Sequence, residues 1–146
     1  PMIGNHVYGC DDCLSVCPWN KFAAAAHANL AFAPRAELAV PRVADLLGLD
    51  DAGFRQVFSG SPIKRIGRDR MVRNAAIVAG NSGEGRLTDP LARLLDDESP
   101  LVRGAAVWAL GRLGVLDAYV GRAEAEEDET VREEWDVALT EPQRAG

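Results

Sequence analysis

The sequence contains little cysteine and few aromatic residues. It has three cysteines, all between Cys10 and Cys17, whereas secreted disulfide-stabilised domains usually carry an even number of separated cysteines. We therefore expect a reducing compartment, the cytoplasm. Aromatic residues make up 6% of the chain, and alanine, leucine and valine supply most of the apolar content. This composition favours packed helices over a β-sandwich.

Long apolar runs are also absent from the sequence. No stretch approaches the roughly 20 apolar residues that cross a bilayer, and no apolar segment follows a basic start as in a signal peptide. We therefore expect no membrane association. At 146 residues, 47% apolar and 26% charged, the chain is long enough for one domain, or one domain with a small appendage. It begins at Pro1 without an initiator methionine, and we expect it to be part of a longer protein.

Charge is unevenly distributed along the chain. The net charge is −6, but residues 120–146 alone hold nine acidic and three basic residues. Residues 64–73 hold five basic residues and one acid, Asp69. These five residues, which we call the basic patch, are Lys64, Arg65, Arg68, Arg70 and Arg73. A local excess of positive charge can contact phosphate even in an acidic protein.

An internal repeat occupies the second half of the chain. Residues 71–80 align with residues 101–110 at an offset of 30 and share the pattern V-R-x-A-A-x-x-A. A degraded third copy covers residues 130–139. Partner helices are expected before each copy, over residues 43–58, 90–97 and 117–124. Helix pairs with this signature resemble HEAT-like repeats, which stack into a continuous core.

Local signals support these helices. Asp89 is expected to cap a helix with Pro90 in its first turn, and Ser99 is expected to cap the next. An apolar stripe with helical spacing follows Pro90 and consists of Leu91, Leu94 and Leu95. We expect Trp108 and Trp135 to pack in the core or between repeats.

The cysteines form a C-x2-C-x3-C-P motif, which has three possible interpretations. In two-cluster ferredoxins the cysteine before proline ligates the other cluster, so Cys10 and Cys13 would hold one iron–sulfur cluster and Cys17 a second. Five further cysteines would then lie elsewhere. A zinc site would add His6 to the three thiolates. A redox pair of Cys10 and Cys13 would lack its usual βαβ context.

The residues around the cysteines carry a family resemblance. The sequence Y-G-C-D-D-C-L-S-V-C-P-W-N-K-F at residues 8–22 resembles the second cysteine motif of tRNA epoxyqueuosine reductases. The sequence S-P-I-K-R at residues 61–65, followed by R-N-A-A at residues 73–76, resembles the start of that family's C-terminal HEAT-like domain. The resemblance runs in order over residues 3–113.

The resemblance implies an oxidoreductase that reduces epoxyqueuosine to queuosine at the wobble position of tRNA. That family uses cobalamin and two 4Fe–4S clusters, which pass electrons to the cobalamin. The cobalamin domain, the general acid and the first cysteine motif lie upstream, so no catalytic residue is expected in this chain, which alone would be inactive. The implied partners are the anticodon stem-loop and the upstream catalytic domain, in a monomer.

The resemblance also assigns residues. Cys10 and Cys13 match ligands of the cluster nearer the surface, and Cys17 matches a ligand of the other cluster. Trp19 and Phe22 would lie near the clusters and exclude water. The residues expected to face tRNA are Lys64, Arg65, Arg68, Arg73 and Asn74. Asn74 could instead bond a neighbouring turn, and Arg103 and Arg132, at the repeat position of Arg73, are expected to pair with acids of adjacent repeats.

The predicted fold is mostly α, with HEAT-like helical repeats over residues 34–146 preceded by part of a ferredoxin-like two-cluster segment over residues 1–33. Residues 120–146 are expected to form an acidic cap. The predicted function is iron–sulfur ligation and tRNA docking within an epoxyqueuosine reductase. Two alternatives stay open: a helical-repeat interaction module with a structural Cys3His zinc site, and another iron–sulfur electron-transfer protein, such as a relative of the reductive dehalogenases.

Overall fold

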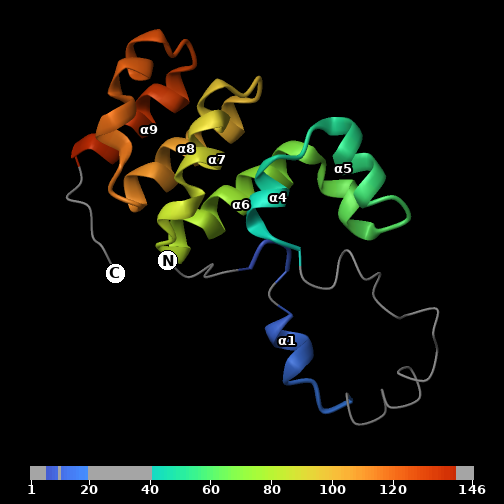
Figure 1. Cartoon of the computed structure of the whole chain (residues 1–146). Coiled ribbons are helices and arrows are strands. Elements are labelled where there is room, and N and C mark those ends of the chain that lie inside the picture. Colours follow the sequence, from blue (N-terminus) through green and yellow to red (C-terminus); the bar gives the residue numbers. More distant parts are fainter. Residues whose placement is uncertain (1–5, 10, 20–40, 141–146) are drawn as a thin grey trace.

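The computed structural model describes residues 6–9, 11–19 and 41–140, and within these ranges the chain is helical and contains no strand (Figure 1). The α-helices are α1 (Asp12–Ser15), α4 (Val43–Leu47), α5 (Asp51–Val57), α6 (Arg68–Ser82), α7 (Thr88–Arg93), α8 (Pro100–Arg112) and α9 (Glu129–Thr140). The 3-10 helices are η3 (Pro62–Ile66), η4 (Gly85–Leu87), η5 (Leu94–Asp96) and η6 (Leu116–Ala125). No helix in the described part is long and apolar enough to cross a membrane.

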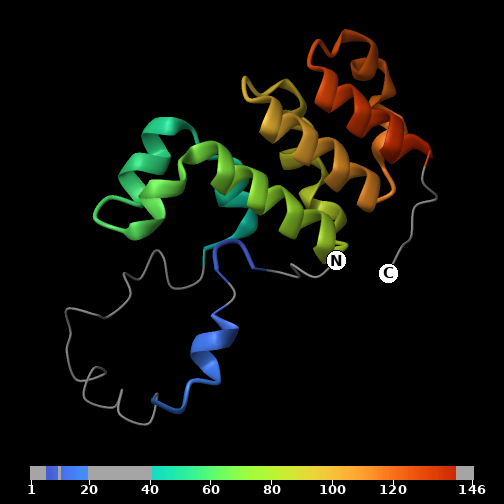
Figure 2. The same ribbon diagram turned by 180° about the vertical axis from the view of Figure 1, so that it is seen from behind.

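The repeats form two layers of helices. The long helices α6, α8 and α9 lie side by side, with α8 packed against both of the others (Figure 2). The shorter helices α4 and α7 form the second layer, with α4 packed against α6 and α7 against α8 (Figure 1). This pairing of a short and a long helix in successive repeats confirms the predicted HEAT-like architecture.

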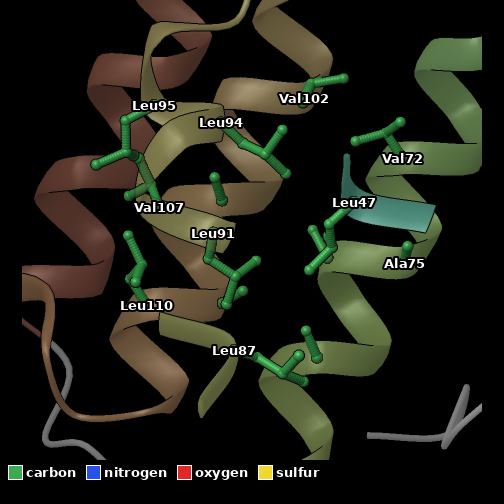
Figure 3. Packing of buried hydrophobic residues seen from close by; sticks show 14 of the residues in the cluster. Leu47, Val72, Ala75, Leu87, Leu91, Leu94, Leu95, Val102, Val107 and Leu110 are labelled. Carbon is green, nitrogen blue, oxygen red and sulfur yellow. The ribbon is translucent and has the colours of Figure 1, made fainter. Parts of the chain in front are cut away.

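The core lies between these two layers. Leu47 of α4, Val72 of α6, Leu91 of α7 and Val107 of α8 belong to one buried cluster between the helices (Figure 3). The predicted apolar stripe after Pro90 is buried, and Trp135 is 3% exposed. Burying a side chain of this kind contributes about 1.5–3 kcal/mol, so the repeat periodicity read from the sequence identifies the residues that stabilise the fold.

A glycine allows α6 and α8 to approach closely. A Cβ atom at Gly80 would lie 2.9 Å from the Cα of Ala109 and 2.9 Å from Cζ3 of Trp108. Trp108 is half-buried and packs against the core cluster. The prediction that Trp108 and Trp135 pack within the repeats is therefore confirmed.

Some helix boundaries differ from the sequence-based prediction. The helix predicted over residues 43–58 is two helices, because Asp50 accepts a hydrogen bond from the backbone N–H of Gly53 at 2.6 Å and starts α5 anew. Helix α7 begins at Thr88, so Asp89 lies in its first turn instead of capping it. Ser99 is the residue before α8, but its side chain makes no capping hydrogen bond. The helix predicted over residues 117–124 is the 3-10 helix η6.

One predicted cross-link between repeats is present in the structure. Arg103 of α8 donates to both carboxylate oxygens of Glu126, at 2.8 and 2.7 Å, and the two side chains are 17% and 7% exposed. This hydrogen bonding raises the pKa of Arg103 and lowers that of Glu126. Arg132 is exposed and forms no ion pair within the part of the chain that the structure describes, so its predicted cross-link is not observed there.

Candidate functional site

The cysteine segment is a short turn around α1. Gly9 and Asp11 both adopt positive φ values, +61° and +51°. The backbone N–H of Ser15 donates to the carbonyl of Asp11 at 2.8 Å, which closes the turn. Cys13 lies within α1 and is exposed, while Cys17 follows it and is half-buried. Both are free thiols, whereas Cys10 and Phe22 lie outside the described residues.

These thiols match an iron–sulfur cluster in type but not in number. Thiolates are the usual ligands of such clusters, and a 4Fe–4S cluster takes four. The described residues supply two free thiols, and the whole chain has three cysteines. The donor set is therefore compatible with cluster ligation only if further ligands come from outside this chain.

The arrangement does not favour the zinc alternative. No three His, Cys, Asp or Glu side chains gather closely enough to hold a metal ion within residues 6–9, 11–19 and 41–140. His6, Cys13 and Cys17 are all in these ranges, so they do not converge as a Cys3His site requires.

Apolar side chains of this segment are open to solvent. Val16 is 79% exposed and Trp19 is 72% exposed. Both views show α1 standing apart from the repeat helices (Figures 1 and 2). The described part of the chain therefore does not bury Trp19, and its predicted place beside a cluster stays a prediction.

The residues just before the cysteines attach the segment to the repeats. Val7 packs against the core cluster. Its carbonyl accepts a 2.9 Å hydrogen bond from Nδ2 of Asn74, on α6. Beside this bond, a cleft of about 340 Å³ lies between residues 6–9 and 11 and the wall formed by Leu46, Phe58, Ile63 and Met71. Asn74 thus bonds a neighbouring segment, which the sequence had left as one of two possibilities.

The basic patch divides into exposed and engaged residues. Lys64 and Arg65 are exposed on η3, which begins where the Ser61 hydroxyl accepts from the backbone N–H of Ile63 at 3.2 Å. Arg70 is also exposed, on the first turn of α6. Lys64 and Arg65 form no ion pair with another residue that the structure describes, and their exposed side chains can reach an external anion.

Arg68 is engaged in the fold instead. Its Nη1 and Nη2 donate to the two carboxylate oxygens of Asp97 at 2.8 and 2.5 Å, and its Nε donates to the carbonyl of Leu49 at 2.8 Å. The side chains of Arg68 and Asp97 are 15% and 9% exposed. The guanidinium therefore links α6 to the following repeat, and the RNA contact predicted for Arg68 would have to break this link.

The Arg68 pair resembles the cross-link one repeat further on. Asp97 accepts from the backbone N–H of Ser99, just as Glu126 accepts from that of Asp128. Burial opposes ionisation of Asp97, but its hydrogen bonds from Arg68 and Ser99 outweigh this and lower its pKa. The hydrogen bond to Asp97 correspondingly raises the pKa of Arg68.

Arg73 has the repeat position of Arg103 but not its contacts. It is half-buried, donates from Nη1 to Oδ1 of Asn74 at 3.2 Å, and forms no ion pair within the described residues. Arg68 takes its place as the partner of the next repeat's acid. Sequence alignment of the repeats could not show this exchange, because Arg68 lies outside the aligned block.

A groove that sequence analysis missed runs between α6, α8 and α9. Its volume is about 430 Å³, and Arg73 and Glu134 contribute charge to its otherwise mostly apolar lining. Part of its wall is Trp108, which the sequence assigned only to packing. The sequence feature that could have indicated this groove is Leu101, a large apolar residue that lies exposed at the start of α8.

Comparison with known proteins agrees with the sequence resemblance. Residues 67–139 match the family of HEAT repeats. The chain is 42% identical over 120 residues to an epoxyqueuosine reductase of Alicycliphilus denitrificans, an alignment covering 77% of this chain and 33% of that protein. Among curated relatives of that name, the chain spans about a third of their length.

Solved structures give the same result. A structure of epoxyqueuosine reductase from Bacillus subtilis superimposes with a TM-score of 0.83 at 29% identity, over 94% of this chain and 38% of that one. A crystal structure of an epoxyqueuosine reductase with an epoxyqueuosine-modified tRNA-Tyr stem loop superimposes with a TM-score of 0.81 at 31% identity, over 94% and 37% of the two chains. The chain belongs to the HEAT-repeat family, and its homologues are epoxyqueuosine reductases, of which it matches about one third.

Proposed function

We propose that this chain is the part of an epoxyqueuosine reductase that supplies iron–sulfur ligands and docks the anticodon stem-loop of tRNA. It would work with an upstream catalytic domain that binds cobalamin. Cys10, Cys13 and Cys17 would ligate two 4Fe–4S clusters shared with upstream cysteines, and Lys64, Arg65 and Arg73 would contact RNA phosphates.

One observation carries this proposal. The segment that carries the free thiols attaches to the repeat domain close to the exposed basic residues. Val7 bonds α6 through Asn74, and the cleft beside that bond is bounded by Ile63, which precedes Lys64 and Arg65 directly. This proximity supports the proposal, because a tRNA reductase needs its electron-transfer group close to the surface that binds the RNA.

The chain's own residues would bind and orient the RNA and would shield the cluster region from water. The exposed ammonium of Lys64 and guanidinium of Arg65 would bind phosphate and fix the register of the stem-loop, a contact that carries no base specificity. Trp19 and Phe22 would exclude water from the cluster region. When bound, the clusters supply electrons for reduction of the epoxide.

Iron content tests the cluster part of the proposal. The full-length protein should contain close to eight irons with matching sulfide after anaerobic reconstitution, and broad charge-transfer absorption. Cys13→Ser should lower the iron content, whereas Ser15→Ala, in the same turn, should not. One stoichiometric zinc and no iron would instead support the structural-zinc alternative.

Salt dependence tests the RNA part. Lys64→Glu with Arg65→Glu should weaken binding of a tRNA anticodon stem-loop and reduce the slope of log K against log salt by about 1.5, since each lost phosphate contact changes it by about 0.7–0.9. Iron content should not change. Arg93→Glu with Arg132→Glu is a matched charge reversal of two exposed arginines elsewhere on the repeats. If both double variants weakened RNA binding equally, the effect would come from net charge alone, and the assignment of Lys64 and Arg65 to tRNA docking would be refuted.

A further inference from the structure

We propose that Asn74 is a positioning residue that sets the placement of the cysteine segment on the repeat domain. Its amide joins the backbone just before the cysteine motif to α6, and Arg73 holds that amide in the required orientation. This inference rests on the proposed function, because it concerns how the ligand-bearing segment is placed relative to the RNA-facing residues.

The hydrogen bond joins two residues that lie far apart in the sequence. Asn74 Nδ2 donates to the carbonyl of Val7 at 2.9 Å, across 67 positions of the chain. Val7 lies three positions before Cys10 and six before Cys13. A shift of Val7 would therefore move the cysteines with it.

Packing alone holds this segment weakly. Val7 contacts the core cluster, but the cleft of about 340 Å³ leaves space between residues 6–9 and 11 and the apolar wall that includes Leu46 and Phe58. Helix α1, which carries Cys13, stands apart from the repeat helices in both views (Figures 1 and 2). An underfilled contact has no unique register, so a directional hydrogen bond determines where the segment lies.

The orientation of the Asn74 amide follows from its two neighbours. A guanidinium has donors and no acceptor, so the atom of Asn74 that faces Arg73 Nη1 at 3.2 Å must be the oxygen. A carbonyl has no donor, so the atom that faces Val7 must be the nitrogen. Both contacts specify the same rotamer, and Arg73 thereby holds the donor toward the segment.

The repeat fold itself does not need an asparagine here. The positions equivalent to Asn74 in the second and third copies are Gly104 and Glu133. Asparagine is also a mediocre residue for a helix interior. The first repeat is the copy whose long helix contacts the cysteine segment, and it is the one that carries a donor at this position.

Asn74→Asp tests the inference in the full-length protein. The carboxylate has nearly the same shape and still accepts from Arg73, but it cannot donate to Val7. Hydrogen exchange of the amides in residues 6–9 should accelerate at least tenfold while the protection of α8 stays unchanged. The kcat for reduction of the modified tRNA should fall by roughly tenfold or more, because small misplacements are costly, with KM for tRNA within about twofold.

Controls separate positioning from folding. Asn74→Ala removes the donor and favours the helix, so it should reproduce both effects even if Asn74→Asp is poorly folded. Asn74→Gln keeps a donor and should restore part of the exchange protection and of kcat. Glu133→Gln, at the equivalent position of the third repeat, should change neither.

The outcomes distinguish this inference from the proposed function. Unchanged exchange at residues 6–9 in Asn74→Asp and Asn74→Ala would overturn the positioning role while leaving iron content and RNA binding intact. Accelerated exchange with unchanged kcat would also overturn it, because the segment's placement would not matter for the reaction. A wild-type protein that binds neither iron nor RNA would overturn the proposed function, whatever the exchange result.

Discussion

Replacing Arg68 with methionine decides whether this residue serves the fold or the RNA. The substitution keeps most of the apolar stem but removes four hydrogen bonds, two to Asp97, one to the carbonyl of Leu49 and a longer one, at 3.4 Å, to Asp69. It leaves the carboxylate of Asp97, 9% exposed, without its cation. Stranding one partner of a buried pair costs about 3–5 kcal/mol, and the 15% exposure of Arg68 places the expected loss near the lower limit, about 3 kcal/mol.

This loss is large enough to measure by thermal unfolding. For a chain of 146 residues, 1 kcal/mol corresponds to roughly 2–4 °C in Tm, so Arg68→Met should lower the Tm by about 6–12 °C in a circular dichroism melt. Asp97→Asn and the double variant complete a cycle, and we expect a coupling energy of about 1.5–3 kcal/mol. Arg55→Met is the matched control, because its i,i+4 pair with Asp51 is 68% and 66% exposed and should contribute at most about 0.5 kcal/mol.

RNA affinity is the second readout of the same variants. At temperatures well below the transition, Arg68→Met should bind an anticodon stem-loop within about twofold of the wild type. A Tm within 2–3 °C of the Arg55→Met control, together with clearly weaker RNA binding, would refute the reasoning. Arg68 would then face RNA, as the sequence had predicted.

Gly80→Ala should destabilise the protein by about 1–3 kcal/mol, because a Cβ atom there would meet Ala109 and Trp108 at 2.9 Å and overpack the contact between α6 and α8. Gly85→Ala is the control, because Gly85 is exposed and has nothing near its Cβ position. If urea titrations showed Gly80→Ala to be more stable than the wild type, the close approach of the two helices would be contradicted. Stability should fall as the pH drops below about 4, because the folded-state pKa values of Asp97 and Glu126 lie below their unfolded values, so their contribution is complete above the unfolded pKa and is lost as pH falls through the folded one. Urea midpoints from pH 7 to pH 3 check this, and a curve of the same shape in a variant carrying both Asp97→Asn and Glu126→Gln would rule out these two carboxylates as its cause.

The repeat architecture was predictable because it follows from the local periodicity of the sequence. Copies 30 residues apart, with small residues at matching positions, fix which faces of α6 and α8 meet, and the leucine stripe after Pro90 identifies the opposing layer. Helix boundaries were less accessible. The break between α4 and α5 depends on the hydrogen bond from Gly53 to Asp50, and the early start of α7 at Thr88 follows directly from η4.

The candidate site was predictable in its residue types but not in its partners. The cysteine motif and the basic patch stand out in the sequence, whereas pairing depends on distances across repeats. Arg68 and Asp97 lie 29 positions apart, and Asn74 and Val7 lie 67 apart. No local pattern distinguishes Arg68 from Lys64 or Arg65, although the structure engages Arg68 within the fold and leaves the other two exposed.

The exchange of roles between Arg68 and Arg73 shows how a repeat array can release one position for a new use. A bond between neighbouring units is required, but the residue that supplies it can move five places along the same helix, more than one turn, and still reach the same acid. The other position can then make a different contact, as Arg73 does with Asn74, while the cross-link between repeats is kept. In other solenoid proteins, an inter-repeat ion pair displaced from its usual position would be a sign that the residue it replaced has been recruited for another task.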